Sequence, residues 1–126
     1  MALDKRTKIG GAYFQGFRLI VSSAPGNYVL DMAQTGAAGI NSLTVIPDQY
    51  GAGDTLTISH MNSDTTITKA TLATNLYNMG RNVSQVFDFP ALEDMRTGES
   101  LRLTYVNTAS IAMNVYTLVE YIGIYR

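Results

Sequence analysis

The 126-residue sequence contains no cysteine and no tryptophan, and its only histidine is His60. Without cysteine the chain forms no disulfide, offers no thiolate to a metal and has no cysteine nucleophile. A zinc site takes three or four nitrogen or sulfur ligands, which a single histidine cannot supply. We therefore expect no metal and no cofactor in this protein.

Long apolar runs are also missing. No stretch approaches the roughly 20 apolar residues that a membrane helix needs, and the N-terminus lacks the apolar core of a signal peptide. The sequence therefore predicts a protein that has no membrane partner and is made in the cytoplasm of its producing cell.

Charge is scarce, at 15% of residues with a net charge of −1, and it is unevenly spread. Residues 1–18 hold one acidic and four basic side chains, whereas the remainder is acidic overall; the basic ones are Lys5, Arg6, Lys8 and Arg18. This pattern predicts a flexible basic arm over residues 1–11, followed by a single domain over residues 12–126. The alternative is a solvated, partly disordered terminus. Elsewhere the basic residues are isolated, which argues against nucleic-acid binding.

One stretch of the sequence occurs twice. Residues 53–62 (GDTLTISHMN) recur 45 positions later as residues 98–107 (GESLRLTYVN). Each position keeps its residue type or a close substitute, except Thr57/Arg102 and His60/Tyr105. Each copy follows a proline that closes an apolar run, so the unit predicts a strand, a loop, an acidic turn and a second strand. A coincidence of common strand-start residues is the competing explanation.

Stretches typical of strands follow one another at intervals of about 8–12 residues, with turn residues between them. We expect strands within 12–21, 28–33, 40–46, 53–62, 65–68, 84–89, 98–107 and 111–125. This pattern predicts an all-β, antiparallel β-sandwich of about eight strands. The duplicated unit favours a jelly-roll-like arrangement with one Greek-key half for each copy. Residues 69–82 fit a loop, a strand or one helical turn.

No catalytic constellation emerges from the sequence. His60 shares the inward phase of its strand with Leu56 and Ile58, which predicts a packed or rim histidine with one hydrogen bond rather than a general base. Asp54 and Glu99 follow glycines, where short polar residues satisfy turn amides. We favour this role over calcium binding.

Two further enzyme classes also find little support. Glu93 and Asp94, as neighbours on a strand, should point to opposite faces, which argues against a glycosidase carboxylate pair. A cupin-like metal enzyme would need several histidines, and this chain has one. We therefore expect no catalytic residue and no enzyme activity.

The last stretch, residues 111–125, is apolar on both faces and carries one charged residue, Glu120. Fifteen extended residues span about 50 Å, and such a strand is an aggregation hazard if its edge is exposed. It must be central in a sheet or covered by another subunit. We predict a subunit interface here, formed by Tyr116, Leu118, Ile122 and Ile124; the alternative is a core strand that is buried on both faces.

Several of these features together resemble the small jelly-roll decoration or cement proteins of tailed bacteriophage heads. They are the short basic arm, the body rich in Thr, Asn, Ala and Gly, the lack of cysteine, the paired Gly53-Asp54-Thr55-Leu56 and Gly98-Glu99-Ser100-Leu101 units, and the terminal strand.

The resemblance implies a homo-oligomer, most often a trimer, on the capsid surface of the virion. Such a protein binds the major capsid protein and stabilises the head by bridging neighbouring subunits. Lys5, Arg6 and Lys8 would then pair with acidic capsid residues. The alternative is a ligand- or carbohydrate-binding β-sandwich, such as a phage tail accessory, with an exposed aromatic platform drawn from Tyr13, Tyr28, Tyr50 and Tyr77.

Overall fold

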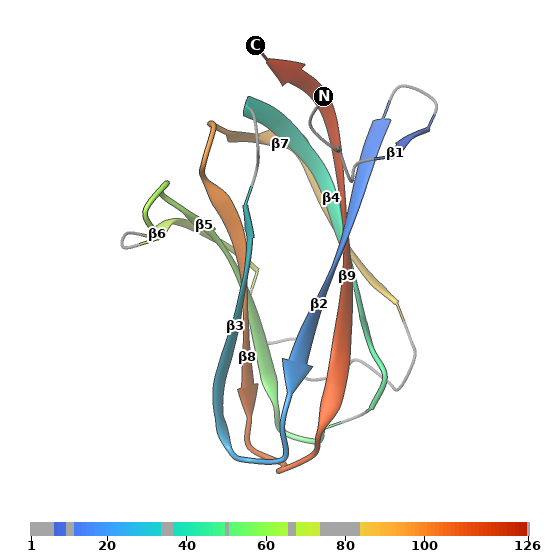
Figure 1. Cartoon of the computed structure of the whole chain (residues 1–126), viewed down its shortest axis with the longest axis vertical. Coiled ribbons are helices and arrows are strands. Elements are labelled where there is room, and N and C mark those ends of the chain that lie inside the picture. The colour runs from blue at the N-terminus through green and yellow to red at the C-terminus, as the bar shows by residue number, and fades with distance from the viewer. Residues whose placement is uncertain are drawn as a thin grey trace, which may run out of the picture.

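The computed structural model describes residues 7–9, 12–33, 37–49, 51–65, 68–73 and 84–125. These residues form nine strands (Figure 1), which are β1 (Thr7–Ile9), β2 (Ala12–Val21), β3 (Gly26–Ala33), β4 (Ala37–Pro47), β5 (Thr55–Met61), β6 (Thr68–Ala73), β7 (Gln85–Met95), β8 (Ser100–Asn107) and β9 (Met113–Tyr125). Over the same residues, nothing forms a helix long and apolar enough to cross a membrane.

The strands form two antiparallel sheets that face each other (Figure 1). Their orders are β1-β2-β9-β4-β7 and β3-β8-β5-β6. From β2 to β9 the chain is a long nested hairpin, in which β2 pairs with β9, β3 with β8, β4 with β7 and β5 with β6. Eight strands nested in this way and wrapped into two sheets are a jelly roll. The predicted all-β sandwich is therefore confirmed.

β1 adds a ninth strand at the edge of the larger sheet. Thr7 pairs with Phe14 and Ile9 with Ala12. Residues 7–9, which belong to the segment expected to be a flexible arm, are thus part of the sheet. Lys5 and Arg6 lie outside the described residues.

β4 ends at Pro47, as its apolar run predicts, but β7 does not end before Pro90. It continues to Met95 through an irregularity in its pairing with β4, where Ile40 faces Glu93 and Ser42 faces Asp88. β7 is an edge strand, and a bulge on an edge strand is one of the few places where a sheet accepts proline. The expectation of a strand that stops at residue 89 was wrong for this reason.

The long strand β9 is central, with β2 on one side and β4 on the other. Its side chains alternate strictly, because Val115, Thr117 and Val119 are buried whereas Tyr116 and Leu118 are exposed. The inward set joins a single apolar core with residues of both sheets. Residues 68–73 of the ambiguous stretch form the strand β6, and residues 74–83 lie outside the described part of the chain.

Candidate functional site

The two copies of the repeat have the same backbone conformation. Gly53 and Gly98 both have φ of 85°, and both sit in tight turns. The turns are closed by hydrogen bonds from Asp54 N to Gly51 O (3.1 Å) and from Glu99 N to Arg96 O (3.0 Å). After each strand, Thr65 (φ 59°) and Ser110 (φ 57°) adopt the left-handed conformation, again 45 positions apart. The structural repeat therefore covers residues 51–65 (copy 1) and 96–110 (copy 2), beyond the ten matched positions of the sequence.

The copies fall in different halves of the jelly roll, as their spacing predicts, yet they lie side by side. Their strands, β5 and β8, are antiparallel neighbours in the four-stranded sheet. Ile58 pairs with its own counterpart Leu103, while Leu56 pairs with Tyr105 and His60 with Leu101. Such a register relates the copies by a local twofold axis at the Ile58–Leu103 pair. The acidic residue of each turn therefore reaches the ring of the other copy.

In one of these two acid–ring sites, Tyr105 Oη donates a 2.5 Å hydrogen bond to Asp54 Oδ2. Asp54 Oδ1 accepts three more, from Thr108 N (2.7 Å), Thr108 Oγ1 (3.0 Å) and Ala109 N (2.9 Å). Asp54 is only 2% exposed. A buried carboxylate with this many donors fixes the ends of two loops to one another.

These contacts shift the pKa values of both partners. Burial on its own raises the pKa of Asp54, but the hydrogen bonds from Tyr105, Thr108 and Ala109 outweigh it, so that the pKa lies below the usual 3.8. Burial, followed by the hydrogen bond to Asp54, raises the pKa of Tyr105 far above its usual 10. The site is therefore an ionised aspartate held by a neutral tyrosine.

Gly51 completes the Asp54 site by leaving room for the carboxylate. A Cβ atom at this position would lie 2.0 Å from Asp54 Oδ2 and 3.0 Å from Tyr105 Oη. Only glycine fits so close to a carboxylate that is held on its other side. The counterpart in copy 2 is Arg96, whose backbone amide instead donates a 2.9 Å hydrogen bond to Glu99 Oε1.

At the second acid–ring site, His60 is buried, as the phase of its strand predicts, but it makes two hydrogen bonds rather than one. Its Nε2 lies 2.9 Å from Glu99 Oε1, and its Nδ1 lies 2.7 Å from Glu93 Oε2 on β7 of the other sheet. The side chains of His60, Glu99 and Glu93 are 4%, 9% and 26% exposed. The imidazole thus links the two sheets near the turn that precedes β8.

His60 can make both contacts in two ways. Either both ring nitrogens are protonated and donate to the two carboxylates, or one of the two carboxyl groups is protonated and donates to the unprotonated ring nitrogen. The two carboxylates lie at opposite nitrogens of the ring and do not converge on a common point. Among the described residues, no group of three or more His, Cys, Asp or Glu side chains is placed so that it could hold a metal ion. Glu93 points toward His60 while Asp94 is exposed, so the two neighbours face apart, as expected.

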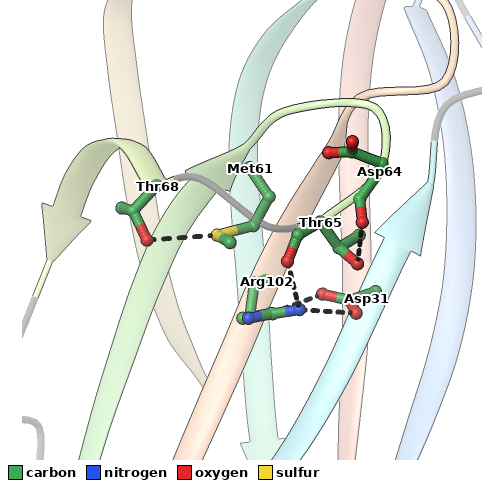
Figure 2. Close-up of polar contacts among 6 residues, drawn as sticks. All are labelled: Asp31, Met61, Asp64, Thr65, Thr68 and Arg102. Atoms are coloured by element: carbon green, nitrogen blue, oxygen red, sulfur yellow. Dashed lines mark hydrogen bonds and ion pairs between the residues drawn. The ribbon is translucent and has the colours of Figure 1, made fainter.

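A third polar cluster lies on the outer face of the four-stranded sheet (Figure 2). Arg102 Nε and Nη2 donate to the two carboxylate oxygens of Asp31 at 2.7 and 3.0 Å. The turn after β5 lies over this pair, and Arg102 Nη2 also approaches Thr65 O at 3.5 Å. Arg102 replaces Thr57 of copy 1, so this ion pair is where the repeat departs from its own symmetry.

The outer face of the five-stranded sheet carries exposed apolar side chains among polar ones, such as the exposed Arg18 opposite Tyr116. Ile20 on β2 is 63% exposed, Tyr116 and Leu118 on β9 are 44% and 40% exposed, and Val86 on β7 is 49% exposed. Leu118 pairs with Thr44, which in turn pairs with Val86, so one row of this face crosses β9, β4 and β7. We call these four exposed side chains the outer patch.

The predicted binding residues divide between described and undescribed parts of the chain. Tyr116 and Leu118 of the predicted interface lie in the outer patch. The side chains of Ile122 and Ile124 are outside the described set, although their backbone belongs to β9. Of the predicted arm residues, only the backbone of Lys8 is described, within β1.

Two of the tyrosines proposed for an aromatic platform are used in internal contacts. Tyr13 stacks on the buried Tyr121 with ring centroids 5.6 Å apart. Tyr28 donates a 2.7 Å hydrogen bond to Ala24 O and lies within hydrogen-bond distance of Ser22 Oγ. Tyr50 and Tyr77 are outside the described residues.

An open depression of about 230 Å³ lies beside the outer patch, lined by Ile20, Val21, Asp48, Gln49, Ala112, Met113 and Asn114. The carboxylate of Asp48 accepts hydrogen bonds from Asn114 N (2.8 Å) and Nδ2 (3.0 Å). These bonds hold the β4–β5 connection against the start of β9.

Sequence reasoning missed the pairing of each acid with the ring of the other copy. The repeat shows which residues are counterparts, but it does not show that the two strands pair about Ile58 and Leu103, the register that brings each acid within reach of the ring of the other copy.

No protein-family model matches the sequence, and no curated protein matches it either. Solved structures that partly match the chain include infectious bursal disease virus of the Gx strain (TM-score 0.42, 15% identity, 97% of this chain and 34% of that one). The Gt strain gives a TM-score of 0.39 at 16% identity, over 94% and 33% of the two chains. A ruminal GH26 endo-β-1,4-mannanase gives 0.38 at 12% identity, over 82% and 19%.

The chain thus spans about a third or less of these solved chains. TM-scores below 0.5 are too low to establish a common fold, so the assignment to the jelly roll rests on strand order alone.

Proposed function

We propose that this protein is a structural component of a virion, namely a decoration or cement protein of a tailed-phage head. In this role it binds the capsid surface, bridges neighbouring major capsid subunits and stabilises the shell. The proposal includes no catalytic activity. The proposal of a structural role is supported by three buried polar residues. His60, Asp54 and Glu99 each hold one element of the fold against another through a hydrogen bond.

The observation that carries the proposal is the outer patch. Large apolar side chains at 40–63% exposure stand together on the face of a sheet whose central strand is hydrogen-bonded on both sides. Exposed large apolar side chains on the face of a sheet are typical of protein–protein contacts. We assign Tyr116 and Leu118 to a contact between copies of the chain, with a trimer as the expected assembly.

The attachment to the shell is assigned to the basic N-terminal arm. Lys5, Arg6 and Lys8 give this segment a positive charge that the body of the protein lacks. Exposed ion pairs with acidic capsid residues weaken as salt rises. Attachment should therefore be salt-sensitive, whereas the contact between copies, being apolar, should not be.

The attachment is tested by mixing the purified protein with empty heads of the phage that encodes it and measuring co-sedimentation. We expect saturable binding and heads that withstand a higher temperature before they open. Replacing Lys5, Arg6 and Lys8 together by Glu should abolish binding, while Arg96→Glu, at an exposed basic residue of the body, should bind like the parent. Equal binding by both variants would contradict the role of the arm.

The assembly contact is tested by light scattering after size exclusion. Leu118→Lys should reduce the mass of the assembly and leave the urea midpoint of the subunit unchanged, because Leu118 is exposed within a copy. Thr97→Lys, at an exposed turn position away from the outer patch, is the control and should keep the parent's mass. A parent that is monomeric and does not bind heads would refute the proposed function.

A further inference from the structure

Four of the described strands stand at sheet edges, and β3 differs from the other three. β1 has three residues, β7 contains Pro90 and pairs irregularly with β4, and the pairing of β6 with β5 shifts register twice. Short length, proline and bulges are the usual means by which proteins prevent an edge from pairing with another chain. β3 has eight residues, contains no proline and pairs with β8 without any shift from Gly26 to Ala33.

The free side of β3 is also unprotected by charge. It forms the left border of the lower half of the molecule in Figure 1, and β8 is its only neighbour among the described strands of the sheet. Its outward-facing residues include Asn27, Val29 and Asp31, and Val29 is 47% exposed. The one charge on the strand, Asp31, is already neutralised by the two hydrogen bonds from Arg102.

We propose that β3 pairs antiparallel with β3 of a second copy, about a twofold axis at Val29. The two four-stranded sheets then join into one continuous sheet of eight strands. In an antiparallel pair, residues opposite one another share a face. An axis at Val29 therefore places Val29 opposite its own equivalent and Asn27 opposite the second copy's Asp31.

This register makes the two strands complementary. The side-chain amide of Asn27 donates to the carboxylate of Asp31, whose oxygens each retain a lone pair beside the Arg102 bonds. On the inner side, Tyr28 meets Leu30. An axis at Asp31 would bring two carboxylates face to face, which is destabilising. An axis at Leu30 would place the apolar Val29 opposite the polar Asp31. An axis at Tyr28 would place Val29 opposite the polar Asn27.

The inference does not depend on attachment to a capsid. It uses the edge of the four-stranded sheet, whereas the outer patch lies on the other sheet. Both surfaces serve one assembly if an oligomer formed through the outer patch pairs with a second one through β3.

The absence of cysteine makes the register directly testable by disulfide trapping in the full-length chain. Residues directly opposite in an antiparallel pair have Cβ atoms about 4.5–5.5 Å apart, close to disulfide range. Under mild oxidation Val29→Cys should form a covalent dimer. Asn27→Cys, on the same face of the same strand, should not, because four residues of strand separate the two thiols by about 13 Å. No cross-linking by Val29→Cys, or equal cross-linking by both variants, would overturn the proposal.

A second measurement uses mass and backbone exchange. Val29→Lys should halve the mass of the assembly, since two like charges then meet at the axis, with no change in the urea midpoint at low protein concentration. Thr97→Lys is the control, because Thr97 is exposed in the turn before β8 and belongs to neither β3 nor the outer patch. The amides of β3 that point away from β8 should exchange more slowly as protein concentration rises. Unchanged mass in Val29→Lys, or exchange that does not depend on concentration, would refute the pairing.

Discussion

Asp54 and Tyr105 belong to different copies of one repeat and are joined by a 2.5 Å hydrogen bond. Their counterparts, Glu99 and His60, are joined by a 2.9 Å bond at the other end of the same strand pair. The local twofold axis between β5 and β8 makes the two contacts equivalent. Each contact joins the turn before one strand to the C-terminal part of the neighbouring strand. The register of the central strand pair is thus held at both ends by buried polar groups.

Tyr105→Phe should lower the free energy of unfolding by about 1–3 kcal/mol, because a buried carboxylate loses one of its donors. Urea denaturation monitored by circular dichroism measures the loss. The matched control is Tyr116→Phe, at an exposed ring on β9, which should stay within about 0.5 kcal/mol of the parent. Equal effects at both positions would show that the Asp54 contact does not hold the fold.

Asp54 should make stability depend on acid pH. Its pKa is lowered in the folded protein, so the stabilisation is fully present above about pH 4 and is lost as pH falls through the lowered value. Asp54→Asn should be less stable than the parent at pH 7 and should show a flatter decline between about pH 4 and pH 2. Urea midpoints of the two proteins over this range provide the measurement. If the urea midpoints of the two proteins fell in parallel as pH is lowered, the acid dependence could not be assigned to Asp54.

Gly51→Ala should be destabilising by about 1–3 kcal/mol, since the new Cβ atom must displace the carboxylate of Asp54. Gly16→Ala is the control on the same chain. At Gly16 a Cβ atom lies 3.7 Å from Thr117 O, an ordinary contact, so we expect no loss of stability. Thermal unfolding of the two variants compares them directly.

The two glutamates should couple unequally to His60. Glu99 is the more buried partner, and burial reduces screening by water and salt. In double-mutant cycles with His60→Ala, the coupling to Glu99→Gln should be in the range of about 0.5–3 kcal/mol and should persist in high salt. The coupling to Glu93→Gln should be smaller and should decrease with salt. A larger coupling to Glu93 would reverse the assignment of which contact dominates.

Much of the fold could be predicted from local patterns. Alternation of apolar and polar residues predicts the phase of β9, and Val115 and Val119 are indeed buried opposite Tyr116 and Leu118. Pro47 marks the end of β4 correctly. The predicted end of the strand before Pro90 was wrong, because the effect of a proline depends on whether its strand is central or at an edge. That position is a property of the sheet and not of the local sequence.

The acid–ring sites could be predicted only in part. The sequence placed Asp54 and Glu99 in turns and His60 on the inward face. It did not reveal that Tyr105 meets Asp54, or that Glu93 crosses from the other sheet to His60. Those contacts join residues 51 and 33 positions apart, and only the packing of strands brings them together.

The repeat illustrates the same division. The sequence by itself determined that two segments adopt the same turn and strand, because glycine permits the φ of 85° that both turns require and the alternation sets which side chains face inward. The tertiary structure alone decided that the copies lie side by side with Ile58 opposite Leu103. Long-range strand pairing selects the neighbour through burial and hydrogen bonding over the whole sheet. That choice turned two acidic turn residues into buried partners of a tyrosine and a histidine.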